Sequence, residues 1–237
     1  MFLFFQTPLC GLLAVGERAT KIVSYVSIAA AVTLFAVIAL ICIKGKRRYD
    51  TKRIAFAGVS LGLSFVLSYV KFSPVTSGGS VTLASMVPLL IYAYFYGVID
   101  GLLVGLIFGL LNFISGPWIL TPMTFVLDYL LAYGSIGIMG LAKKLGKSEK
   151  HAALQTLLGV LLVYLARFTF HLLSGVIYFT ENSIWVDFPD WALANAFIYS
   201  FIYQCLYLPF DCLISAVCFY LLAKTNTLEK LQKALKK

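Results

Sequence analysis

Charged side chains are scarce in this sequence, and their scarcity excludes most classes of soluble protein. Asp, Glu, Lys and Arg make up 12% of the 237 residues, whereas soluble domains carry about 25%. Hydrophobic residues account for 61%, and the mean hydropathy is +0.92. Most of the chain divides into apolar runs close to the length of about 20 residues that spans a bilayer as a helix. We therefore expect binding or catalysis to occur within or at a membrane.

Signatures of catalysis and of metal binding are also missing. The sequence holds no HExxH, GxSxG or zinc-ligand pattern, and two histidines cannot build a histidine-rich metal site. Gly146-Lys147-Ser148 resembles the end of a phosphate-binding loop, but Leu141 stands where that loop needs glycine. The five cysteines show no CxxC spacing, so no disulfide framework is indicated. The sequence predicts a protein that is not an enzyme and that needs no cofactor and no metal.

Seven apolar runs are predicted to cross the membrane, and basic residues separate them in an alternating pattern. The predicted spans are residues 22–43, 54–70, 81–96, 98–115, 122–142, 152–179 and 191–223. Lys and Arg cluster in alternate connections, with six in residues 44–53, four in 143–150 and five in 224–237. Because cytoplasmic loops carry such an excess, we expect a multi-pass protein of the cell membrane with its C-terminus in the cytoplasm.

This pattern divides the chain into three parts of an all-α integral membrane protein. Residues 1–52 hold an N-terminal apolar segment and an extra transmembrane helix that ends in a basic block. Residues 53–223 form a six-helix membrane domain, and residues 224–237 form a basic cytoplasmic tail. The net charge of +9 follows from these clusters, so it indicates topology and contact with the lipid bilayer and not a nucleic-acid partner.

Small residues recur every four positions in two of the predicted spans. The span 98–115 and the turn before it carry such a row of glycines, which comprises Gly97, Gly101, Gly105 and Gly109. The span 54–70 carries Gly58 and Gly62, and a row of Ser60, Ser64 and Ser68. Small residues at this spacing let helix backbones approach closely. Two interpretations are open for Gly58 and Gly62, namely packing within the bundle and a docking surface for another membrane subunit.

Among the charged or titratable side chains inside otherwise lipid-soluble stretches are Asp128, Arg167 and His171. A charge at bilayer depth costs at least roughly 2.5–3.5 kcal/mol, so these residues are expected to face the bundle interior. One interpretation is a structural Asp128–Arg167 ion pair, with His171 hydrogen-bonded in a packed core. The other is a small-ligand site, because polar groups that converge among many aromatics are typical of such sites. A carboxylate among Tyr and Phe rings suits a cationic, aromatic ligand.

Four segments around these residues resemble the substrate-binding S subunits of energy-coupling-factor (ECF) vitamin transporters, most closely the thiamine-specific ThiT/YuaJ family. The segments are GGSVTLASMVP at 78–88, LDYLLAY at 127–133, RFTFHLLSGVIYF at 167–179 and YSFIYQ at 199–204. The resemblance covers about residues 53–223 and implies the six-helix S-component bundle, here with an extra N-terminal transmembrane helix. It also implies high-affinity thiamine binding and uptake.

The resemblance assigns a set of substrate-binding positions to this chain. They are Asp128, Tyr129, Arg167, His171, Gly175, Phe179, Tyr199 and Gln204. Arg167 and His171 would contact the aminopyrimidine ring of thiamine, whereas Tyr199 and Gln204 would lie near its thiazolium ring. Residues 72–79 would form a flexible lid.

The resemblance also implies partners. A separate ECF transmembrane coupling subunit and two ATPase subunits would drive uptake, and Gly58 and Gly62 would dock onto the coupling subunit. The sequence departs from the family pattern at Leu130, Phe168 and Gln204, where Pro, Tyr and Asn are usual. Two alternatives therefore stay open: an S component for another vitamin or a pyrimidine precursor of thiamine, and a membrane scaffold protein that transports nothing.

Overall fold

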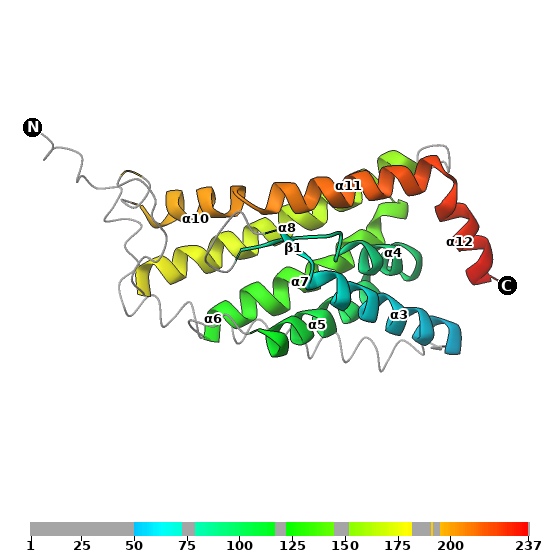
Figure 1. Cartoon of the computed structure of the whole chain (residues 1–237), viewed down its shortest axis with the longest axis horizontal. Helices are drawn as coiled ribbons and strands as arrows, with labels where there is room; N and C mark the ends of the chain where they lie inside the picture. Colours follow the sequence, from blue (N-terminus) through cyan, green and yellow to red (C-terminus); the bar gives the residue numbers. More distant parts are fainter. Residues whose placement is uncertain are drawn as a thin grey trace, which may run out of the picture.

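A computed structural model describes residues 50–72, 79–116, 122–144, 152–181, 191 and 195–236. The predicted N-terminal segment and its transmembrane helix lie outside the described residues, as do residues 73–78, the greater part of the predicted lid. The described part is an elongated bundle whose main helices run along its long axis (Figure 1). Helix α12 turns away from the end of α11, at the end of the bundle that holds the C-terminus (Figure 1).

The described elements are almost all helical. In chain order they are α3 (Thr51–Ser68), β1 (Lys71–Phe72), β2 (Val81–Thr82), α4 (Val87–Tyr96), α5 (Val98–Ser115), α6 (Pro122–Thr124), the π-helix η1 (Phe125–Leu131), α7 (Ala132–Gly134), the 3₁₀-helix η2 (Ser135–Lys144), α8 (Ala152–Glu181), α10 (Ala196–Cys205), α11 (Leu208–Lys224) and α12 (Thr227–Lys236). Four stretches are long and apolar enough to cross a membrane: Val98–Ser115, Phe125–Ala142, Ala153–Ile177 and Ala196–Lys224. The prediction of an all-α membrane protein is therefore confirmed in its main features.

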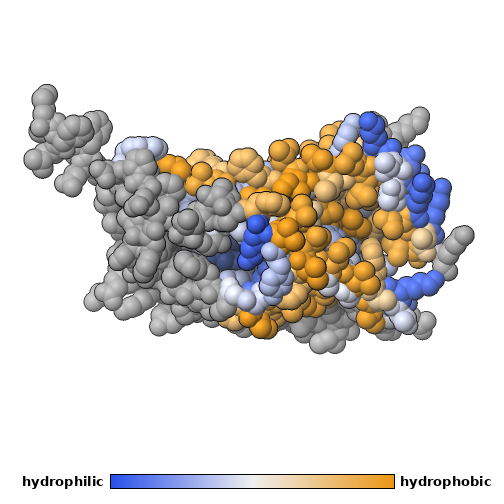
Figure 2. Space-filling view, viewed as in Figure 1, coloured by the Kyte–Doolittle hydropathy of each residue, from blue (hydrophilic) through white to orange (hydrophobic). Residues whose placement is uncertain are grey.

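The outer surface of the bundle is apolar, as a lipid-facing surface must be. Apolar residues cover the middle of the face shown in Figure 2, and hydrophilic residues gather at the end formed by α12. Along α11, Phe210, Leu213 and Leu221 are each more than half exposed. Contiguous exposed apolar surface of this kind is unusual for a soluble monomer and marks contact with lipid or with another membrane protein.

Two predicted helix boundaries are wrong. The third span does not begin at Val81, because Val81 and Thr82 pair antiparallel with Lys71 and Phe72 before the chain turns into α4 at Val87. The seventh span is not one helix, since the chain breaks between α10 and α11. Pro209 lies in the first turn of α11, where its missing N–H is tolerated but where it cannot continue a preceding helix. The two helices nevertheless run end to end beside α8 (Figure 1).

The glycine row of α5 packs tightly inside the bundle, as its spacing predicted. A Cβ atom at Gly101 would overlap Ala93 of α4, one at Gly105 would overlap the Tyr133 carbonyl, and one at Gly109 would overlap the Tyr129 carbonyl. Gly97 differs from the other three, since it ends α4 with a φ of +96° and its Cβ position meets no atom of the described residues within 4 Å. The close approach of α5 to the main chain of η1 and α7 therefore depends on the absence of side chains.

The two rows of small residues on α3 face in opposite directions. Ser60, Ser64 and Ser68 are buried against the bundle. Gly58 and Gly62 are exposed, and a Cβ atom added at either one would meet nothing within 4 Å in the described part of the chain. Gly58 and Gly62 therefore do not pack against the other described helices.

An ion pair holds the first turn of α3 to the bundle. The Arg53 guanidinium pairs with the buried Asp100 carboxylate in the first turn of α5. The same guanidinium lies 5.1 Å from the centre of the Tyr96 ring, within the range of cation–π attraction. This contact fixes the position of the helix that carries the exposed glycines.

Alanine substitutions in these two glycine rows are expected to have different effects on stability. Gly105→Ala places a methyl group against a main-chain carbonyl that cannot move aside, and overpacking of this kind costs roughly 1–3 kcal/mol. Gly58→Ala adds its methyl group to open space and should leave stability unchanged or slightly improved. Thermal unfolding of the purified proteins in detergent measures the difference. Equal melting temperatures for the two variants would contradict the packing described here.

Candidate functional site

The Asp128 carboxylate is the centre of a polar cluster at membrane depth. Asp128 lies in the π-helical turn η1, within the apolar stretch Phe125–Ala142, and π-helical turns are frequent at functional sites. Its Oδ1 lies 2.7 Å from Nδ1 of His171 on α8, and its Oδ2 accepts a hydrogen bond of 2.6 Å from Ser174 Oγ. The Asp128 side chain is still 25% exposed, so it keeps a surface for a ligand.

His171 is held at both its ring and its main chain. Its Nδ1 faces Asp128, and its ring meets Tyr207 edge-on with the ring centres 6.4 Å apart. The Gln204 side-chain amide donates to the His171 carbonyl oxygen at 3.2 Å, and the Tyr207 hydroxyl donates to Gln204 Oε1 at 2.5 Å. Among the described residues, the buried Nε2 of His171 has no hydrogen-bond partner. That nitrogen is therefore a buried ring atom whose hydrogen-bonding capacity the described residues leave unused.

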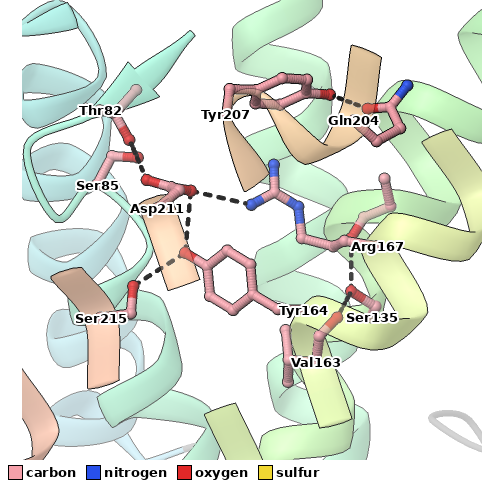
Figure 3. Close-up of polar contacts among 11 residues, drawn as sticks. Thr82, Ser85, Ser135, Val163, Tyr164, Arg167, Gln204, Tyr207, Asp211 and Ser215 are labelled. Carbon is pink, nitrogen blue, oxygen red and sulfur yellow. Dashed lines mark hydrogen bonds and ion pairs between the residues drawn. The ribbon is translucent and has the colours of Figure 1, made fainter. Parts of the chain in front are cut away.

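Arg167 pairs with a different carboxylate from the one that the sequence suggested. Its Nη1 donates to Oδ2 of Asp211 at 3.3 Å, and both side chains are buried (Figure 3). The interpretation of a direct Asp128–Arg167 pair is wrong, because Asp128 pairs with His171 while Asp211 takes the guanidinium. The guanidinium carbon lies 5.0 Å from the centre of the Tyr133 ring. Within the described part of the chain, the buried Nε of Arg167 makes no hydrogen bond.

Tyr199 and Tyr203 of α10 extend the cluster with aromatic surface. Tyr199 is buried, and its ring stacks on that of Tyr203 with the centres 6.4 Å apart. The Tyr203 hydroxyl oxygen accepts a hydrogen bond of 2.6 Å from the main-chain N–H of Gly79. Gly79 is the last residue of the predicted lid, so the end of that segment is joined directly to the cluster.

Three predicted substrate-binding positions remain: Tyr129 on η1, and Gly175 and Phe179 on α8. Gly175 lies where α8 meets α10, and a Cβ atom there would overlap the Ser200 side chain. The Tyr129 ring packs against Phe113, with the centres 5.4 Å apart. Phe179 belongs to α8, but its side chain lies outside the described residues.

Three contributors to the cluster were missed as site residues from sequence: Ser174, Tyr207 and Asp211. Ser174 binds Asp128 directly, and Tyr207 binds Gln204. Two of the three had a signal in the sequence, since Ser174 lies three residues after His171 and Tyr207 lies three after Gln204. Residues three apart share a helix face, although Tyr207 lies in the turn after α10.

The comparison with protein families decides which kind of membrane protein this is. A model of the family described as thiamine transporter protein (Thia_YuaJ) matches residues 54–231. The chain belongs to this family. The match covers all eight predicted substrate-binding positions, together with Gly58 and Gly62.

Individual relatives agree with the family match. The thiamine transporter ThiT of Bacillus subtilis (strain 168) is 30% identical over 164 residues, which cover 65% of this chain and 80% of that protein. A solved structure of ThiT from Listeria monocytogenes aligns with a TM-score of 0.60 and 22% identity. That alignment covers 74% of this chain and 96% of the Listeria chain, and it shows that the two share a fold. The resemblance derived from the sequence is confirmed.

The functional groups of the cluster are suited to binding a small molecule, as expected for a member of a thiamine transporter family. The cluster offers a carboxylate, an imidazole nitrogen, a guanidinium, an amide and tyrosine rings, which together can pair with a cationic, nitrogen-rich aromatic compound. In the part of the chain that the structure describes, no group of three or more His, Cys, Asp and Glu side chains is placed to hold a metal ion. The cluster is therefore a candidate small-molecule site within the bundle.

Proposed function

We propose that this protein binds thiamine with high affinity as the S component of an ECF-type transporter. The observation that carries the proposal is the cluster of Asp128, His171 and Arg167 at membrane depth. Asp128 keeps exposed surface, and one buried nitrogen of His171 and one of Arg167 have no hydrogen-bond partner among the described residues. Leaving a buried polar group unsatisfied costs about 1–3 kcal/mol, so these groups are better explained by a ligand than by mutual neutralisation.

Thiamine has the chemistry that this cluster requires. Its thiazolium ring carries a fixed positive charge, which suits the Asp128 carboxylate and the faces of nearby tyrosines. Its aminopyrimidine ring offers nitrogen acceptors and an amino donor, which suit His171 and Arg167. The proposed contact set is Asp128, Tyr129, Arg167, His171, Gly175, Phe179, Tyr199 and Gln204.

In the proposed topology, the ligand is captured on the outer side of the membrane, and the energising subunits act from the cytoplasmic side. Residues 53–223 form a six-helix core preceded by an extra transmembrane helix. The C-terminus is cytoplasmic, because the Lys and Arg clusters lie in the tail and in the connections on the same side of the membrane as the tail. The exposed face of α3 around Gly58 and Gly62 docks onto an ECF transmembrane coupling subunit, and two ATPase subunits hydrolyse ATP. The open space around both glycines supports this role, since small residues let a partner helix approach closely. The chain itself catalyses no reaction.

Thiamine is expected to stabilise the purified protein against heat. A ligand at a thousand times its Kd adds about 4 kcal/mol, and each kcal/mol raises the melting temperature of a chain of this size by about 2–4 °C. A shift on the order of 10 °C should therefore appear with thiamine and should vanish in His171→Ala, which removes the ring that binds Asp128.

A panel of ligands in the same measurement separates the alternatives. A larger shift with a pyrimidine precursor or with another vitamin would assign the site to that compound instead of thiamine. A folded protein that no compound in the panel stabilises would favour a scaffold whose buried charges merely pair.

A further inference from the structure

The Asp211 carboxylate joins three elements at the base of the candidate site. Asp211 lies in the first turn of α11 and is only 5% exposed. Its Oδ2 accepts hydrogen bonds from the Tyr164 hydroxyl at 2.9 Å and from Arg167 Nη1 at 3.3 Å, both on α8. Its Oδ1 accepts one from Thr82 Oγ1 of β2 at 3.1 Å (Figure 3). Both oxygens of the carboxylate are therefore held before any ligand binds.

The neighbours of Asp211 are themselves fixed, so the carboxylate has little freedom to turn. Thr82 Oγ1 lies 2.6 Å from Ser85 Oγ, and the Tyr164 hydroxyl lies 2.9 Å from Ser215 Oγ. Tyr164, Ser85 and Ser215 are buried, and hydrogen bonds in a buried network reinforce one another. The network presents Oδ2 of Asp211 to the guanidinium from a fixed direction.

Arg167 depends on this carboxylate for its orientation. Asp211 is the acidic partner of Arg167 within the described residues, and the guanidinium otherwise rests near the faces of the Tyr133 and Tyr164 rings. The faces of aromatic rings attract the positive charge, but they do not fix the direction in which the N–H groups of the planar guanidinium point. Figure 3 shows the guanidinium between Asp211 and the Tyr207–Gln204 pair, with its second terminal nitrogen on the side of that pair. Gln204 in turn binds the main chain of His171.

We propose that Asp211 is a positioning residue for ligand binding: it holds one nitrogen of Arg167 so that the rest of the guanidinium faces the ligand. The inference rests on the proposed function, because it assumes that Arg167 contacts the bound molecule. A purely structural ion pair would have a different effect, since it would support folding while leaving the affinity of the folded protein unchanged.

A double-mutant cycle on the full-length protein, with thiamine as the titrated ligand, tests this role. Asp211→Asn keeps the size of the side chain and removes its charge, and it should weaken binding about 10- to 100-fold, the range for a hydrogen bond to a charged group. In an Arg167→Met background, the same Asn substitution should weaken binding by less than about threefold, because the group that Asp211 positions is absent. Thr169→Ala removes a hydroxyl that is exposed on α8 and binds the Leu165 carbonyl, outside the Asp211 network, and it should leave the Kd unchanged.

Two results would overturn the inference: an unchanged Kd in Asp211→Asn, or an equal loss of affinity with and without Arg167. If Asp211→Asn does not fold, Thr82→Val gives the same comparison, since it removes the hydrogen bond that holds Oδ1 of Asp211. A loss of affinity that depends on Arg167 supports the role, and an affinity equal to that of the wild type contradicts it. Absence of thiamine binding by the folded wild-type protein would instead reject the proposed function, so the two failures are distinguishable.

Discussion

Asp128→Asn is expected to weaken thiamine binding by at least about 30-fold. The substitution preserves the size of the side chain but removes the negative charge beside His171. Removing one partner of a buried, hydrogen-bonded charge pair costs roughly 2–5 kcal/mol, which corresponds to a Kd about 30-fold to several thousand-fold higher. Because the proposed ligand is a cation, its charge would then be buried without a counter-charge. Titration calorimetry of the purified variant measures the change.

Two variants control this experiment. Glu229→Gln neutralises an acid that is exposed on α12, away from the site, and should leave the Kd unchanged. Ser174→Ala removes one hydrogen bond to Asp128 while keeping the carboxylate, and it should cost about tenfold or less. If Asp128→Asn binds thiamine as tightly as the wild type while folding normally, the carboxylate does not contact the ligand as proposed.

Gly58→Leu and Gly62→Leu are each expected to lower thiamine uptake by cells at least about tenfold while leaving binding intact. Neither leucine meets another atom of the described bundle near its Cβ, so the fold and the site should persist. A leucine at a close helix–helix contact, by contrast, separates the two backbones, and overpacking costs roughly 1–3 kcal/mol or more. Uptake of labelled thiamine by cells that also produce the ECF partners, compared with binding by purified protein, separates the two effects.

Thr169→Leu is the matched control for the docking face. Thr169 is exposed on α8, and its hydroxyl binds the Leu165 carbonyl of its own helix. The variant adds a leucine of the same size to a different lipid-facing surface and should transport normally. Unimpaired uptake by a Gly58→Leu, Gly62→Leu double variant would show that this face of α3 serves another purpose.

Rows of small residues illustrate how far the sequence alone could predict this fold. The tight packing of Gly101, Gly105 and Gly109 was predictable, because a spacing of four residues puts side chains on one helix face. The opposite directions of the two rows on α3 could also have been derived. Gly58 and Ser60 are two residues apart, which is about 200° around a helix of 3.6 residues per turn. Which row faces the bundle depends on neighbouring helices, so only the structure shows it.

The region before α4 could not be predicted from apolar composition. Val81 begins an apolar run that reads equally well as helix, and its antiparallel pairing with β1 joins segments that no local pattern brings together. Ala84 also has a positive φ of 56°, a conformation that is uncommon for residues other than glycine and that no local pattern announces. Two β-branched residues in succession, Val81 and Thr82, were the available signal.

The partners of the buried charges were harder to predict than the charges themselves. Helix periodicity placed Arg167 and His171 on one face of α8, and both face the interior as expected. Periodicity gives no rotation of one helix relative to the next, so it could not decide whether Asp128 or Asp211 meets Arg167. The break near Pro209 made this harder, because α11 is a separate helix and the direction in which its side chains face cannot be extrapolated from α10.

Isothermal titration of the purified wild-type protein with thiamine tests the central claim most directly. The inward-facing cluster of Asp128, His171, Arg167 and Gln204 predicts saturable, tight binding of one thiamine per chain. A correctly folded protein that releases no saturable heat with thiamine, over a range of temperatures that excludes an accidental zero enthalpy, would contradict the account.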